Sequence, residues 1–117
     1  MVELTMQIPD ELAKRVVPMS RWLPTILELS LVGFKTPAAE TAGELIDFLS
    51  EAPSRRKLLN YHVSNRAQTR LQRLLALNEA GISSEAEQRE LDELQKIEHI
   101  MIMLKARLVA SCSARAL

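Results

Sequence analysis

The residues that could carry acid–base, nucleophilic or metal chemistry are few and far apart. His62 and His99 are the only histidines, and neither has a Cys or His neighbour at the spacing of a zinc ligand pair. Glu98 and His99 are adjacent, so on a helix they point about 100° apart and cannot hold one ion together. The sequence also lacks a glycine-rich phosphate loop, a dinucleotide fingerprint and a nucleophile elbow. We therefore expect no enzyme activity, no metal site and no cofactor.

Charge is the second feature that could do chemistry, because it is segregated along the chain. The 15 basic and 15 acidic residues cancel overall, but residues 51–75 hold six basic and one acidic side chain, and residues 76–100 hold two and seven. The two blocks could lie on neighbouring helices and neutralise each other. Alternatively, the basic block could form a phosphate-binding patch. The candidate patch residues are Arg55, Arg56, Lys57, Arg66, Arg70 and Arg73.

Composition bounds the fold that must position these groups. A chain of 117 residues makes one domain with an appended arm, and 47% hydrophobic residues can supply its core. Aromatic residues make up only 3%, so the core must be aliphatic, which favours helices. The single Cys112 excludes a disulfide within the chain and fits the reducing cytoplasm. No apolar stretch is long enough to cross a membrane, so we expect a soluble cytoplasmic protein.

The first residues alternate apolar and polar side chains, which is typical of a strand. Val2, Leu4, Met6 and Ile8 would share one face. No second strand pattern follows, so the predicted partner is the same strand of a second chain in a homodimer.

Three helices are predicted next. Pro9 opens a short helix that Pro18 ends, and a capping box at residues 41–44 opens a third helix that ends before Pro53. Between them, Ser20 can cap a helix that ends near Gly33; because Pro24 is tolerated only in the first turn, the alternative is a start a few residues later. The stretch 36–41 is interpreted as a loop or as a first helical turn after Pro37. The helix at residues 22–33 is apolar on most sides, which places it in a core or a dimer interface.

The second half predicts a helical hairpin. Ser64 caps its first helix, Gly81 ends that helix, and residues 84–87 form a capping box for a last helix at about residues 85–110. The last helix outruns its partner, so its apolar end must pack on the N-terminal half or on another chain. Its apolar stripe consists of Leu91, Leu94, Ile97, Met101, Leu104 and Leu108.

Together these signals predict a mainly α fold with one short N-terminal strand, about five helices and a long C-terminal hairpin. The expected organisation is an N-terminal region at residues 1–52, a linker at 53–63 that can hold one short helix, and a helical arm at 64–117.

The strand, the Pro-Asp-Glu-Leu sequence at residues 9–12 and two helices ending near Gly33 resemble the ribbon-helix-helix family of the Arc and Met repressors and many bacterial antitoxins. The resemblance implies a dimeric ribbon in the major groove of DNA, with Thr5 and Gln7 contacting bases and Ser20 and Arg21 holding a phosphate. The expected dimer or partner interface comprises Leu4, Met6, Ile8, Trp22, Ile26, Leu29, Met101 and Leu104.

Two functions follow as hypotheses. In the first, the chain is an antitoxin-like transcriptional regulator that binds operator DNA as a homodimer, while its C-terminal helices bind a toxin. In the second, it is a helical homo-oligomeric adaptor with no nucleic-acid role.

Overall fold

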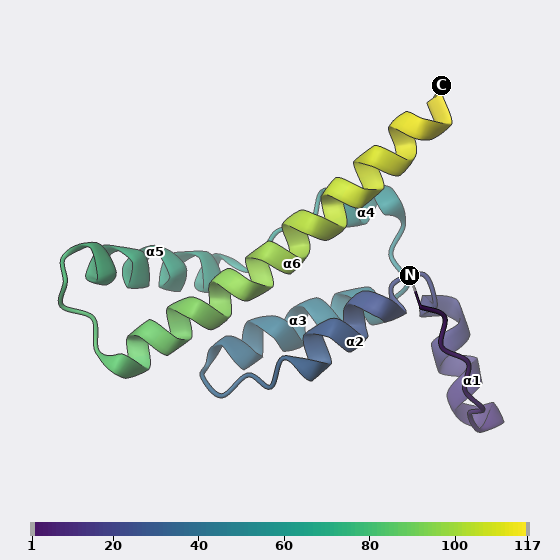
Figure 1. Ribbon diagram of the computed structural model, residues 1–117, viewed down its shortest axis with the longest axis horizontal. Helices are drawn as coiled ribbons and strands as arrows, with labels where there is room; N and C mark the ends of the chain where they lie inside the picture. Colours follow the sequence, from purple (N-terminus) through teal and green to yellow (C-terminus); the bar gives the residue numbers. More distant parts are fainter. Residues whose placement is uncertain (1, 117) are drawn as a thin grey trace.

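Six α-helices and one short 3-10 helix make up the fold (Figure 1). The computed structural model describes the backbone of residues 2–116 and the side chains of residues 2–110. Within residues 2–116 there is no strand, so the mainly α class is confirmed and the N-terminal strand is not. The elements are α1 (Asp10–Val16), η1 (Val17–Met19), α2 (Leu23–Leu31), α3 (Ala38–Ser50), α4 (Arg55–Leu59), α5 (Asn65–Glu79) and α6 (Glu85–Ala116).

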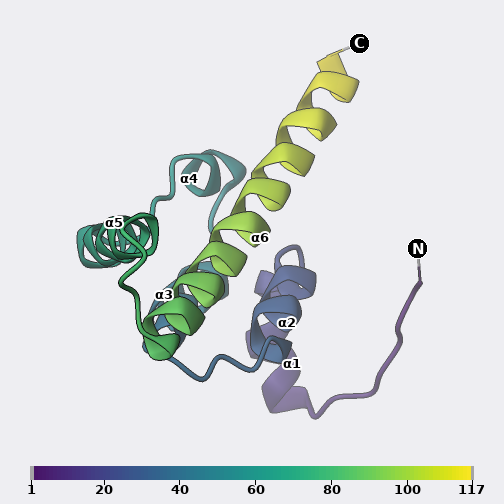
Figure 2. The same cartoon turned by 60° about the vertical axis from the view of Figure 1, so that its left-hand side comes forward.

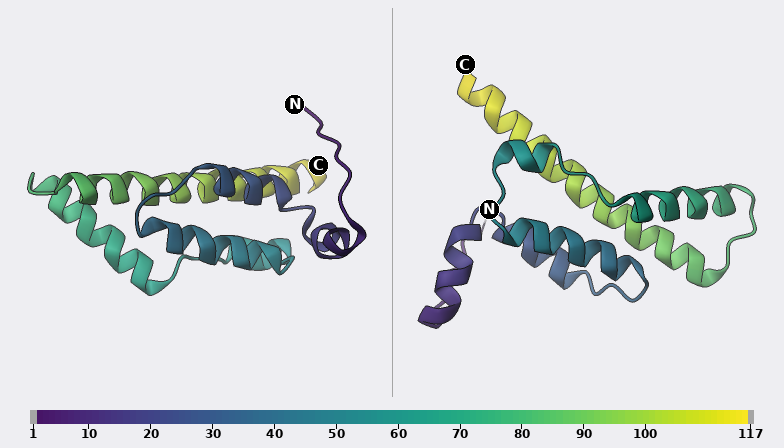
Figure 3. Two further views of the ribbon diagram at one scale, coloured as in Figure 1. Left: turned by 90° about the horizontal axis from the view of Figure 1, so that it is seen from below. Right: turned by 180° about the vertical axis from the view of Figure 1, so that it is seen from behind.

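The longest helix, α6, is the element on which the others pack. Its 32 residues run the length of the molecule, with α5 folded back against its first part, α2 and α3 against its middle and α4 further along (Figures 1 and 3). Every residue of the predicted stripe is buried. The expectation that the apolar end of this helix packs on the N-terminal half is confirmed.

One hydrophobic core unites the chain from α2 to α6. Leu45 and Leu49 of α3 and Leu58 of α4 are fully buried in this core, together with Leu74 of α5. Leu58 lies within the linker predicted at residues 53–63, and that linker does hold one short helix. The core is therefore continuous across the boundary that composition indicated.

The N-terminal strand prediction is wrong for the described chain. Residues 2–9 have no regular secondary structure, and they extend away from the helices that share the core (Figure 2). Val2, Leu4 and Met6 are exposed, and Ile8 is half-buried. The physical reason is that alternation provides one apolar face but no hydrogen-bonding partner, and the chain offers no second strand.

Prolines decide where two helices begin. The predicted start of α1 after Pro9 and its end before Pro18 are confirmed. Ser20, however, does not cap α2, which starts at Leu23 with Trp22 at the N-cap and no side-chain cap. The reason is Pro24, whose fixed φ and missing N–H suit only the first turn of a helix.

The third helix also begins at a proline. It starts at Ala38, directly after Pro37, which matches the second of the two alternatives for residues 36–41. Thr41 is buried inside the helix instead of capping it, so the capping box predicted there is wrong.

The first N–H of α3, that of Ala38, donates to Thr36 Oγ1 at 3.2 Å, and a carboxylate of α6 in turn holds Thr36. Glu93 accepts hydrogen bonds from the backbone N–H of Lys35 at 3.1 Å, from the N–H of Thr36 at 3.1 Å and from the Thr36 hydroxyl at 2.7 Å. Burial by itself would raise the pKa of Glu93, but these hydrogen bonds from Thr36 and Lys35 together lower it. The carboxylate therefore ties the chain before α3 to the side of α6.

The turn signals of the hairpin are confirmed. Ser64 Oγ accepts the N–H of Ala67, and Gly81 adopts a φ of 71° after α5. In the capping box, Ser84 Oγ accepts the N–H of Glu87 at 3.1 Å, while Glu87 accepts the N–H of Ser84 at 2.9 Å.

The molecule is more extended than a compact domain. Its radius of gyration is 16.5 Å, whereas about 13 Å is expected for a compact chain of this length. The excess comes from the two ends of the fold, where the α5–α6 hairpin and the segment around α1 project from the core (Figure 1). No helix among the described residues combines the length and the apolar character that a membrane crossing requires.

The Glu93 clamp generates a pH-dependent prediction. Because its pKa is lower in the folded than in the unfolded chain, its stabilisation is complete above the ordinary value of 4.5 and is lost as the pH falls through the folded-state pKa. Glu93→Gln should cost about 1–2 kcal/mol of unfolding free energy at pH 7 and nothing in strong acid. Urea unfolding at both pH values measures this, with the exposed Glu98→Gln as control. Equal costs at both pH values would contradict the clamp.

Candidate functional site

The short helix α1 is amphipathic. At about 100° per residue, the apolar side chains fall on one side and the charged ones on the other. The charged side chains are Asp10, Glu11, Lys14 and Arg15, and the apolar ones are Leu12, Ala13, Val16 and the following residue, Val17, which keeps helical backbone angles.

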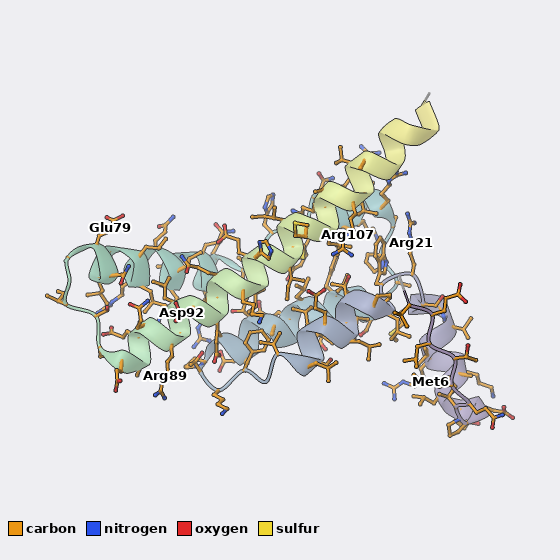
Figure 4. All side chains as sticks on the ribbon, in the orientation of Figure 1. Met6, Arg21, Glu79, Arg89, Asp92 and Arg107 are labelled. Atoms are coloured by element: carbon orange, nitrogen blue, oxygen red, sulfur yellow. The ribbon has the colours of Figure 1, made fainter. Side chains whose placement is uncertain are left out.

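No side chain of α1 is buried, although one whole side of the helix is apolar. Leu12 is 43% and Val17 65% exposed, while Val2, Leu4 and Met6 of the preceding arm are 95%, 76% and 60% exposed. We call residues 2–17 the N-terminal segment. Figure 4 shows Met6 on this segment, away from α6. On α1 itself, Leu12 and Val17 lie at the two borders of the apolar side, and Ala13 and Val16 between them are half-buried. Exposed apolar side chains gathered on one segment are typical of an interaction site.

The charges of α1 follow its dipole. Asp10 and Glu11 lie in the first turn, and Lys14 and Arg15 lie in the last turn. Within the chain, Lys14 Nζ is 3.7 Å from Glu11 Oε1, and both side chains are at least three-quarters exposed. Such an exposed pair contributes little to stability, so the charged groups remain accessible to another molecule.

The four residues expected to bind DNA are not brought together. Thr5 and Gln7 are exposed on the arm, which forms no ribbon among the described residues. Ser20 and Arg21 lie in the turn between η1 and α2. The Arg21 guanidinium lies 4.8 Å from the centroid of the Trp22 ring, a cation–π distance. Figure 4 labels Arg21. Since α2 begins at Leu23, the expected phosphate clamp at its first residues is not assembled.

The six basic residues separate into two groups. Arg66, Arg70 and Arg73 of α5 line a hollow against the start of α3. The α4 residues lie elsewhere, where Arg56 and Lys57 are exposed near Tyr61. The third α4 residue, Arg55, donates from Nη2 to the Leu108 carbonyl oxygen at 3.1 Å. The chain therefore offers no single patch made of all six.

One arginine of the basic block is paired with the acidic block. Arg70 donates from Nε and Nη2 to the two carboxylate oxygens of Glu90, at 2.6 and 3.0 Å. Glu90 is only 5% exposed, whereas the Arg70 side chain is 40% exposed, so this bidentate pair links α5 to α6 with its acidic half buried and its basic half partly in solvent. At this pair, the basic residues of 51–75 and the acidic residues of 76–100 neutralise each other on neighbouring helices, which was the first of the two alternatives.

Five of the eight predicted interface residues belong to the core of a single chain. The Trp22 indole N–H, for example, donates to the Pro53 carbonyl oxygen at 3.0 Å. Because α6 presents its stripe to α2 and α3, these side chains need no second chain to cover them. Only Leu4, Met6 and Ile8 remain outside the core, and the five buried residues are Trp22, Ile26, Leu29, Met101 and Leu104.

Sequence reasoning overlooked the apolar side of α1. The spacing of four between Leu12 and Val16, and between Ala13 and Val17, is the helical signal that could have identified it.

Comparison of the chain with protein-family models, curated proteins and solved structures finds no match. Within the described residues, no group of three or more histidine, cysteine or acidic side chains is arranged to hold a metal ion. The function therefore has to be argued from the geometry of this chain alone.

The Arg70–Glu90 pair can be tested by removing Arg70, its more exposed partner. Arg70→Met leaves the buried Glu90 carboxylate without a counter-charge, which should cost about 1–3 kcal/mol of unfolding free energy, less than for a fully buried pair, because the Arg70 side chain is 40% exposed and water screens the site. Arg66→Met, on the same face of α5 but exposed, should change stability by less than about 0.5 kcal/mol. Urea unfolding of the two variants measures the difference, and equal effects would mean that the pair carries no special weight.

Proposed function

We propose that this chain is a helical homo-oligomeric adaptor that associates with a second copy of itself through the N-terminal segment. The observation that carries the proposal is the exposure of Leu12 and Val17 on the apolar side of α1, where Ala13 and Val16 are half-buried, together with the exposed arm before it. The α2–α6 core is complete without these residues. A cytoplasmic location is part of the proposal and rests on the single cysteine of the sequence.

The charges of α1 favour a second copy over an unrelated partner. Asp10 and Lys14 border one edge of the apolar side, and Glu11 and Arg15 border the other. When two such helices pack antiparallel about a two-fold axis, each edge meets the same edge of the partner in reverse order. Each acidic residue then faces a basic residue four positions away, on both edges at once. The surface is therefore complementary to itself.

The size of the surface agrees with self-association. The exposed side chains of Val2, Leu4, Met6, Leu12 and Val17 present on the order of 600 Å² per chain, near the roughly 800 Å² that each partner contributes to a standard interface. The net charge of zero adds no overall repulsion between copies.

Operator binding and toxin binding have weaker support. The resemblance to the ribbon-helix-helix family depended on a strand that residues 2–116 lack. No observation on this chain favours nucleic acid in its place. The regulator hypothesis stays a prediction from sequence, and salt-dependent binding of duplex DNA would be its test.

The self-association can be tested by separating the charges of α1. A variant with Lys14→Glu and Arg15→Glu has only acidic charges on α1, and a variant with Asp10→Lys and Glu11→Lys has only basic ones. Each should be monomeric by light scattering at concentrations where the unchanged chain is a dimer, because like charges then face each other on both edges. Mixing the two variants should restore the dimer mass.

The substitutions leave the core untouched, since α1 contains no buried residue. Circular dichroism should therefore show folded monomers in both cases. Dimers in either variant alone, or a wild-type chain that is monomeric at millimolar concentration, would contradict the proposal.

A further inference from the structure

An apolar cavity lies where α5 diverges from α6, beneath the connection that follows α4. Its volume is about 270 Å³. Leu71, Leu94, Ile97 and Met101 supply much of its wall, and residues 61–63 of the connection close one side. None of its lining residues belongs to the N-terminal segment, so the cavity is independent of the surface proposed for self-association.

A positive charge lies at the wall of this cavity without an ionic partner. Lys105 is half-buried, and its Nζ donates a hydrogen bond to the Tyr61 carbonyl oxygen at 2.7 Å. No carboxylate of the described side chains lies within 4.0 Å of this ammonium group. An ammonium group has three donors, so two remain for another acceptor.

Two more polar side chains line the cavity, and both are less firmly held than Lys105 because they are exposed. His62 also lines the cavity and can donate from its ring. Glu98 lines it as well, but it is exposed and accepts no recorded hydrogen bond from the described residues. The positioned charge is therefore the cation, and the carboxylate can turn to solvent.

We propose that this cavity binds a small amphipathic carboxylate, with its apolar body between α5 and α6 and its carboxylate on Lys105. The volume is close to the lower end of small-molecule sites, which begin at about 300 Å³, so the body is a short acyl chain or a single ring. An apolar body would remove the cavity wall from water, and the anion would give the half-buried ammonium its missing counter-charge.

The stacked ring of Tyr61 holds the connection that carries the carbonyl contact. Its centroid lies 4.4 Å from that of Phe48 in α3, with the ring planes at 25°. Tyr61 is therefore held both by its ring on α3 and by its carbonyl oxygen on Lys105 of α6, so three elements of the fold build the polar end of the cavity.

Octanoate is a suitable probe, with octanol and octylamine as neutral and cationic probes of the same length. Methyl NMR titrations of the full chain should show octanoate shifting the signals of Leu71, Ile97 and Met101. Octanoate should bind more tightly than octanol, and octanol more tightly than octylamine. Lys105→Met should weaken octanoate about tenfold, the equivalent of one charge-assisted hydrogen bond, and leave octanol unchanged.

Lys96→Met is the matched control, because it makes the same change at an exposed position of the same helix. It should leave all three affinities unchanged. Ala67→Leu, which fills the cavity from α5, should abolish binding of octanoate and octanol together and so locates the site even if the lysine variant is unstable. Equal affinities for the three probes, an unchanged octanoate affinity in folded Lys105→Met, or shifts that spare the cavity methyl groups would overturn the proposal.

Discussion

The burial of a single stripe along α6 is the constraint on which the rest of the structure depends. Its six residues from Leu91 to Leu108 are all buried, and they span about five turns. A buried Leu, Ile or Met side chain contributes about 1.5–3 kcal/mol, so covering this stripe is the largest favourable term available to the chain. No single helix is long enough to cover it. The hairpin partner α5 covers the first part, and α2, α3 and α4 share the remainder.

The sharing of the α6 stripe among several shorter helices explains the two surfaces to which we assign a role, the cavity beside Lys105 and the N-terminal segment. Because α5 is much shorter than α6, the connection after α4 covers the next part of α6, and the cavity beside Lys105 lies where this connection meets the two helices. Because α2 to α5 already cover the stripe, nothing in the core requires α1 or the arm before it. Most of their apolar side chains therefore remain exposed, and this is the surface that we propose for a second copy.

The parts of the fold that local chemistry determines could be predicted from the sequence. The α6 stripe, the Ser84 capping box and the turn at Gly81 depend on spacing of three or four residues, and all three are confirmed. The errors occur where the outcome depends on residues distant in sequence. The alternation at residues 2–8 predicts which side chains would share a face of a strand. It does not indicate which other strand would pair with these residues. The capping box predicted at residues 41–44 is wrong because Thr36 accepts the first N–H of α3 instead, and Thr36 is held there by Glu93 of α6. The cavity carries no local signal, since its walls come from three helices and a connection.

The central claim is that α2–α6 form one cooperative unit and that the N-terminal segment lies outside this unit. Amide hydrogen exchange at two protein concentrations tests this claim most directly. At low concentration, amides from residue 91 to 108 should exchange only through global unfolding, whereas those of residues 2–17 should exchange nearly as fast as in an unfolded chain. At high concentration, protection should appear in α1 alone. Protection of α1 equal to that of α6 at every concentration, or fast exchange in the second half of the α6 stripe, would contradict the account.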